Sequence, residues 1–212
     1  MSTRLTLCDT SGPLIDLIQK LSGEEGEMWL RCLKRMLRKE NPREAVTAPD
    51  FQAWKTIKLG TGLKTAPDFL TALNEQKFQT SNWAKNILGK LEFTVVAQET
   101  EIDLVVVTVA ELGFPKSATR QDIYQRAQKL GLDLCPAEVG PQLRIQYKDQ
   151  PKGESLLIGM EPITNSDGDL RVFRVVHDDE DLWLNSCCGS PDIFWGADRR
   201  WVFLRRKPAR NA

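Results

Sequence analysis

The chain has 212 residues, of which 41% are hydrophobic and 27% are charged, proportions typical of an ordinary globular protein. Its formal net charge is zero, so no overall field favours nucleic acid or an anionic membrane, and we do not expect nucleic acid as the partner. No apolar run approaches the roughly 20 residues of a membrane span. Residues 1–14 also lack the long apolar core of a secretory signal, so the default location is the cytoplasm.

The five cysteines are an odd number, and none of them has Cys-x-x-Cys spacing. This pattern argues against structural zinc and gives little support to a disulfide framework. We expect neither a metal nor a cofactor.

Residues 1–90 are predicted to be mainly helical. Apolar residues recur at helical spacing after Pro13, and residues 24–39 place glutamates at one end and basic residues at the other, which suits a helix dipole. Two short helices are expected further on, one capped by Thr65 and one capped by Thr80 or Ser81 and ending at Gly89. Residues 54–65, which lead to the segment capped by Thr65, predict a loop or a short hairpin.

The pattern changes near residue 91, where β-branched residues become frequent. Residues 91–112 predict one long strand or two, and residues 117–131 predict a capped helix that ends at Gly131. A second short helix is expected after Pro136. Strands follow over 155–163, 170–177, 181–186 and 200–206. The sequence thus predicts an α+β protein with a boundary near residue 90.

Two polar features have more than one interpretation. His177 is the only histidine, so a Ser-His-Asp or Cys-His site would have to use it, but its place at a strand edge favours a solvated surface residue. Residues 165–170 (NSDGDL) partly resemble a calcium loop, whereas Asp167-Gly168 is a common hairpin signal, and we favour the turn.

Residues 185–200 (NSCCGSPDIFWGADRR) have no period, although strand-like segments flank them. They contain no Lys, Glu, Gln or Met, types that make up about a fifth of the chain. Composition alone gives this absence odds of roughly one in forty. An irregular surface loop of ordinary origin remains the alternative explanation.

The part of the chain from residue 91 resembles the variable proteins of diversity-generating retroelements. The resemblance rests on residues 103–113 (DLVVVTVAELG), 133–147 (DLCPAEVGPQLRIQY), 159–169 (GMEPITNSDGD), 182–186 (LWLNS) and 200–207 (RWVFLRRK). It implies a C-type lectin-like domain over 91–212, a mainly helical region over 1–90, and a variable region near 185–200.

In that family, a reverse transcriptase copies a template and substitutes at its adenines, so Asn codons of the template become codons that end in C or T. Such codons encode no Lys, Glu, Gln, Met or Trp. The Trp codon contains no adenine, so Trp195 would persist as scaffold. The implied scaffold residues are Trp183, Trp195 and Trp201. The implied ligand-binding residues are Ser186, Cys187, Cys188, Gly189, Ser190, Asp192, Ile193, Phe194, Gly196, Asp198, Arg199 and Arg200.

The resemblance implies a non-enzymatic binding protein whose partner is an unknown protein or another macromolecule. It also allows display on a virion or a cell surface through a further partner. The competing hypothesis is a small nucleic-acid-binding regulator that uses the N-terminal helices. If the lectin-like prediction is right, residues 105–109 and 201–205 share one sheet, the variable side chains face solvent together, and Trp195 points inward.

Overall fold

A computed structural model describes residues 7–37, 51–178 and 180–206. The chain divides into two compact units, residues 1–50 and 51–212. The predicted boundary at residue 90 was therefore wrong. Residues 51–90 belong to the larger unit, because their strands and helices pair with and pack on elements that come later in the chain.

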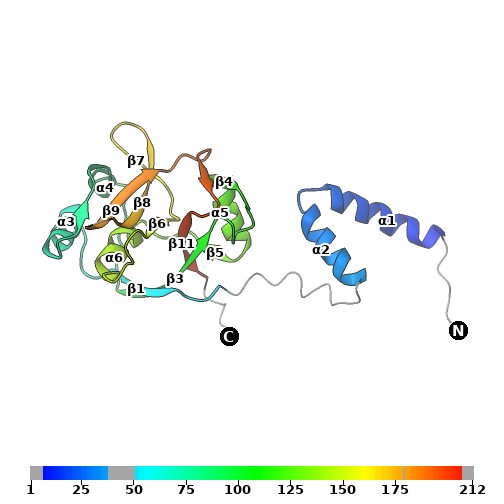
Figure 1. Ribbon diagram of the computed structural model, residues 1–212, viewed down its shortest axis with the longest axis horizontal. Coiled ribbons are helices and arrows are strands. Elements are labelled where there is room, and N and C mark those ends of the chain that lie inside the picture. Colours follow the sequence, from blue (N-terminus) through cyan, green and yellow to red (C-terminus); the bar gives the residue numbers. More distant parts are fainter. Residues whose placement is uncertain (1–6, 38–50, 179, 207–212) are drawn as a thin grey trace. The chain divides into compact units, whose positions relative to one another are not determined.

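The smaller unit contains two helices, α1 (Leu7–Ser22) and α2 (Gly26–Leu37), as the apolar spacing predicts (Figure 1). Helix α1 begins before Pro13, so this proline lies inside the helix and not at its start. No side chain that the structure describes in α1 or α2 is buried, and Ile18 and Leu37 are more than half exposed.

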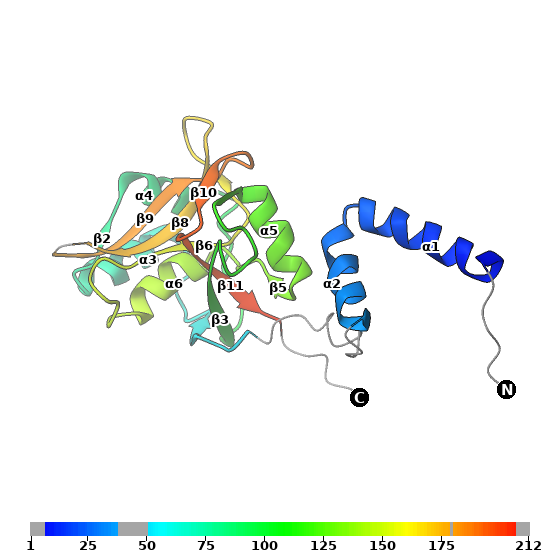
Figure 2. The same ribbon diagram turned by 45° about the vertical axis from the view of Figure 1, so that its right-hand side comes forward.

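The larger unit is built on a curled sheet that Figure 2 shows from the side. Along its main path the order is β1 (Lys55–Leu59), β3 (Thr100–Thr108), β11 (Arg200–Arg205), β6 (Ser155–Ile158), β8 (Leu170–His177), β9 (Leu182–Cys188) and β2 (Gln79–Thr80). Strand β5 (Leu132–Asp133) pairs with β11, and β7 (Ile163–Thr164) pairs with β8. The β11–β6 and β2–β9 pairs are parallel and the other pairs are antiparallel. The predicted α+β class is confirmed.

Strand β1 replaces the loop or short hairpin expected over residues 54–65. Its partner is β3, with Ile57 opposite Ile102, so the pairing is long-range. Ile57 and Leu59 are buried, and this burial stabilises a strand that has no local partner.

The terminal strand pairs with the first long strand of the domain, as predicted. In β11 and β3, Trp201 lies opposite Val107 and Phe203 opposite Val105. Residues 91–112 were expected to form one long strand or two. The strand in this range, β3, begins only at Thr100 and ends at Thr108.

Helices α3 (Ala66–Glu75), α4 (Asn82–Leu88) and α6 (Val139–Gln146) belong to the core that contains Leu156, Val175 and Leu184, on what we call the first face of the sheet. Thr65 caps α3, as predicted, through a capping box with Asp68, and of the two predicted candidates Thr80 and Ser81 it is Ser81 that caps α4. Close packing of α6 on β8 requires a glycine. A Cβ at position 140 would lie 2.5 Å from the ring of Phe173.

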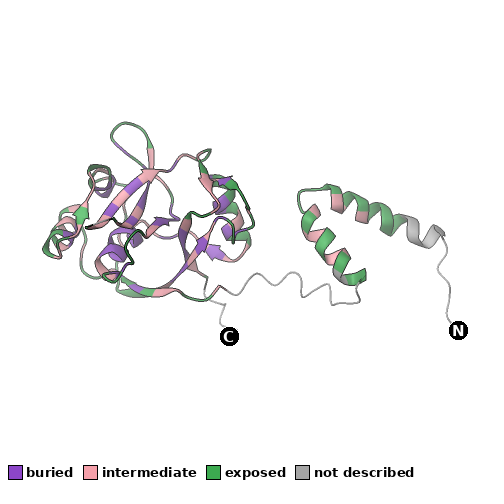
Figure 3. Ribbon diagram, viewed as in Figure 1, coloured by how far each residue is buried: buried purple, intermediate pink, exposed green. Residues whose placement is uncertain are grey.

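The second face carries another core, which contains Leu157, Trp201 and Phe203 and is covered by α5 (Arg120–Lys129). Thr119 caps α5, and Gly131 follows the helix with a positive φ of 88°. Figure 3 shows these two cores as buried stretches along the central strands. The first face is therefore covered along most of the sheet, and the second face is covered over β3, β11 and β6.

Candidate functional site

The segment predicted to vary connects the end of β9 to the start of β11, and it is more regular than the sequence suggests. Residues Phe194–Gly196 form a strand, β10, which pairs with β4 (Ser117–Thr119) in a separate two-stranded sheet. In this pair Trp195 lies opposite Ala118. No sequence pattern predicted β10, because three residues are too few to show alternation.

Main-chain hydrogen bonds anchor this segment along its length. The backbone N–H groups of Arg120 and Gln121 donate to the carbonyls of Ile193 and Pro191, both at 3.0 Å. Farther along, Ala197 donates to the Lys116 carbonyl at 2.8 Å, and Val109 donates to the Arg199 carbonyl at 3.1 Å. None of these bonds depends on the identity of a side chain in the segment.

Aromatic contacts supply a second anchor. The ring of Trp195 meets that of Trp201 edge to face, with ring centroids 5.5 Å apart. Trp201 is fully buried and also packs edge to face on Tyr124 at 5.6 Å. The prediction that Trp195 points inward is therefore confirmed, and Trp201 is a core residue. Trp183 is only half-buried, so it is a weaker scaffold residue than predicted.

The tip of the segment presents side chains to solvent. Asp192, Phe194, Asp198 and Arg199 are exposed, and the exposed fraction of Phe194 is 68%. An exposed phenylalanine on an ordered strand suits a contact surface, because burial of its ring by a ligand removes apolar area from water. The remaining predicted residues of this part are half-buried: Cys188, Ser190, Ile193, Gly196 and Arg200.

Three predicted ligand-binding residues do not belong to the surface. Ser186 is only 8% exposed and lies opposite Phe173 on the first face. Cys187 packs against both cores, and burial raises the pKa of its thiol to about 12. Gly189 is buried, and a Cβ there would approach Pro162 to 3.0 Å. Ser186 and Cys187 lie in β9, an interior strand between β8 and β2, whereas Gly189 follows this strand and lies against Pro162 and Val172.

A cleft of about 420 Å³ lies where the segment meets the loop before β6. Residues 151–155 form one side, and Asp198, Arg199 and Arg200 form the other. Arg200 forms an ion pair with Glu154, which also accepts a hydrogen bond of 2.8 Å from the Tyr147 hydroxyl. Sequence reasoning missed residues 151–155, since only the parallel pairing of β6 with β11 places them here. Another cavity, of about 650 Å³, lies among α3, β2 and α4, whose residues form its walls.

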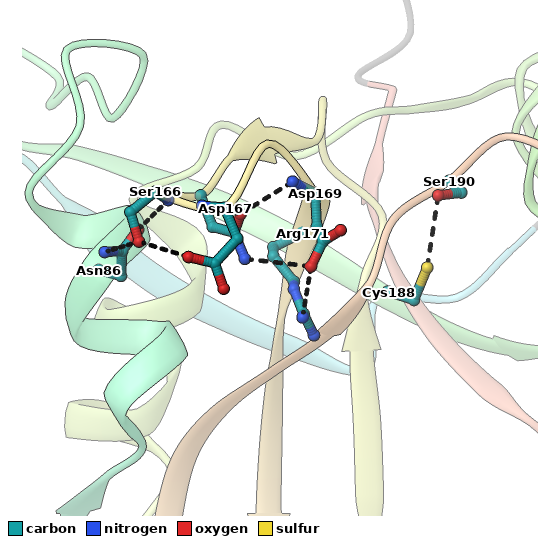
Figure 4. A network of polar contacts seen from close by, with 8 residues as sticks. Asn86, Ser166, Asp167, Asp169, Arg171, Cys188 and Ser190 are labelled. Atoms are coloured by element: carbon teal, nitrogen blue, oxygen red, sulfur yellow. Dashed lines mark hydrogen bonds and ion pairs between the residues drawn. The ribbon is translucent and has the colours of Figure 1, made fainter.

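Residues 165–169 form a turn, as predicted. The side chain of Asn165 accepts hydrogen bonds from the backbone N–H groups of Asp167 and Asp169, and Gly168 has a positive φ of 86°. Figure 4 shows Ser166 in contact with Asn86 of α4, and Asp169 paired with an arginine of β8. Among the described residues no group of three or more His, Cys, Asp or Glu side chains could hold a metal ion.

The histidine and the paired cysteines do not form one site. His177 is half-buried and not fully solvated, and its Nδ1 lies 2.6 Å from the Gln150 carbonyl oxygen. The register places it opposite Leu182, whereas Cys187 lies opposite Val172 farther along the strands. In Figure 4 the Cys188 thiol points to the Ser190 hydroxyl, 3.5 Å away. A Cys–His arrangement is thus absent from this part of the sheet.

No family model, curated protein or solved structure matches the chain. Within residues 7–37, 51–178 and 180–206, no helix combines the length and the apolar character that crossing a membrane requires.

Proposed function

We propose that this chain is a ligand-binding variable protein, diversified by a retroelement, whose contact surface is centred on residues 190–200. One observation carries the proposal. The backbone of this segment is held by main-chain hydrogen bonds and by the Trp195–Trp201 contact, while Asp192, Phe194 and Arg199 are exposed. Such a segment tolerates exchange of its exposed side chains, because its conformation is fixed by other groups.

The scaffold of the proposal is a C-type lectin-like domain. The pairing of terminal strand β11 with β3, and the two helices α5 and α6 between β3 and the later strands, support it. The domain would then include residues 51–90, which supply β1 to one edge of the sheet and β2 to the other. The sequence has no paired Glu-Pro-Asn calcium motif, so we propose protein or other macromolecular ligands, and not calcium-dependent sugar binding.

The proposed role is binding without catalysis. The exposed groups of the segment are carboxylates, an arginine and an aromatic ring, a set typical of contact surfaces. We propose that a further partner carries the protein to a virion or a cell surface, where a diversified site is of use.

The DNA around the gene tests the proposal. We expect a reverse transcriptase gene nearby, together with a near copy of the segment that encodes residues 190–200. The two copies should differ at adenines of the template, at the codons of Asp192, Phe194, Asp198 and Arg199. The Trp195 and Trp201 codons should be identical in both. A genome without a reverse transcriptase gene or a near copy would contradict the proposal.

A further inference from the structure

Part of the second face of the sheet is open. The register places Trp201, Leu157, Arg174 and Asn185 in one row across β11, β6, β8 and β9. Trp201 and Leu157 are buried, but Arg174 and Asn185 are half-exposed. Val176 lies in the next row, between Ser155 and Trp183, and all three are half-exposed. We call these five residues the Arg174 platform: Ser155, Arg174, Val176, Trp183 and Asn185.

The described helices that pack on β8 and β9 lie on the other face. Helix α6 meets β8 at Phe173, and the ring of Trp83 in α4 lies 4.9 Å from the guanidinium of Arg171. Phe173 and Arg171 alternate with Arg174 along β8, so their side chains point to the first face. The platform is therefore not covered by a described helix of the larger unit.

Arg174 has an unusual environment for an arginine in a sheet. Within the described residues its side chain forms no hydrogen bond or ion pair, and its Nε is buried without an acceptor. The Nε of Arg171 is also buried without an acceptor, but Arg171 pairs with Asp169 through its Nη2, and Arg200 pairs with Glu154. The half-exposed Arg174 side chain has no carboxylate partner within the described residues, so a ligand carboxylate meets no competing acceptor there.

The platform adjoins the predicted variable segment. Arg200 pairs with Leu156 of β6, so Arg199 lies next to Ser155, and the two line the same cleft. Arg199 and Arg174 are two strands apart, a separation on the order of 10 Å between their backbones. The side chain of Arg199 is exposed. The nearby Glu154 carboxylate is occupied by Arg200, so two arginines without carboxylate partners remain on this surface.

We propose that the Arg174 platform binds an acidic segment of a protein ligand, with a ligand carboxylate on Arg174 and an apolar group against Trp183. The inference rests on the proposed binding function and names the ligand chemistry of that surface. A planar guanidinium matches a carboxylate in bidentate geometry. Arg174 lies in β8, outside residues 185–200, so every diversified form of the protein would keep the same carboxylate anchor while residues 190–200 select the rest of the ligand.

A peptide selection tests this directly. The full chain, Arg174→Gln, Arg174→Lys and Lys129→Gln are each used to select binders from one random-peptide phage library. Lys129 is exposed on α5, on a different part of the surface, and its change removes the same charge. Equal thermal melts of the four proteins show that each is folded. Arg199→Gln serves as a second variant at an exposed position.

We expect peptides selected by the full chain and by Lys129→Gln to be enriched in Asp and Glu over the unselected library. Arg174→Gln should lose this enrichment and bind the selected peptides about tenfold more weakly, the effect of one charge-assisted hydrogen bond. Arg174→Lys should retain part of the affinity, because it keeps the charge without the bidentate geometry.

Peptides without acidic enrichment, or an enrichment that Arg174→Gln retains, would overturn the inference alone. Failure of every protein to select any peptide would overturn the proposed binding function as well. Displacement of the peptides by a twelve-residue oligothymidylate at equal charge would show a general polyanion site, which also contradicts recognition of an acidic protein segment.

Discussion

Replacement of Trp201 by Ala should destabilise the larger unit far more than a change of all four exposed residues of the segment. Trp201 is fully buried, meets Trp195 and Tyr124 edge to face, and stacks on Phe203 at 6.3 Å. Truncation of a buried Trp costs about 3–5 kcal/mol, and each aromatic pair adds about 0.5–1.5 kcal/mol beyond area burial. The free energy of unfolding of a domain is only about 5–15 kcal/mol, so Trp201→Ala should leave the larger unit barely stable.

The comparison protein carries serine at positions 192, 194, 198 and 199. Exposed substitutions usually change stability by within about 0.5 kcal/mol each, so the combined loss should stay below about 2 kcal/mol. Urea denaturation followed by far-ultraviolet circular dichroism measures both, and Trp201→Phe provides a milder variant if Trp201→Ala does not fold. Equal losses in the serine protein and Trp201→Ala would refute the division into anchor and surface.

Other positions give further tests. Ser186→Asp should cost more than about 2 kcal/mol in urea melts, because it buries a charge beside Phe173, whereas Ser190→Asp should cost little. Glu138→Ala should cost about 3 kcal/mol, since the backbone N–H groups of Gly60 and Val96 would lose their acceptor; a loss below about 1 kcal/mol would contradict this role. Stability should fall as pH rises from 9.0 towards about 12, where the Cys187 thiol ionises in the unfolded but not the folded chain. Cys187→Ser should make this alkaline loss shallower in urea melts at several pH values; an unchanged slope would contradict the burial of the thiol.

The sequence predicted features that depend on local chemistry. The caps at Thr65 and Ser81 and the turn at Gly168 occupy the positions that their side chains or backbone freedom favour. Each feature involves residues a few positions apart, so a short window of sequence contains the whole cause. The α+β class followed from the same local patterns.

Features that depend on distant partners were not predicted. Strand β1 is defined by its pairing with β3 and strand β2 by its pairing with β9, and neither partner is close in sequence. This is why the boundary was placed at residue 90 and not at residue 50: residues 51–90 were assigned by helix content, although their strands complete both edges of the main sheet. The Arg174 platform was missed for the same reason, because its residues come from three strands.

The segment from 185 to 200 has an enclosed first part and an exposed second part. Its amino-acid composition alone does not show where one part ends and the other begins. Positions 186, 187 and 189 are enclosed by the two cores or by neighbouring backbone, and they hold Ser, Cys and Gly, three of the smallest residues. Steric limits alone explain small residues at these positions, since a larger side chain would overlap its neighbours. From position 190 onward the exposed residues are large or charged, and the backbone is held by β4 and the residues after it. The diversification proposed above would therefore have room to act at 190–199, and we expect template differences to be concentrated there, with 186, 187 and 189 unchanged.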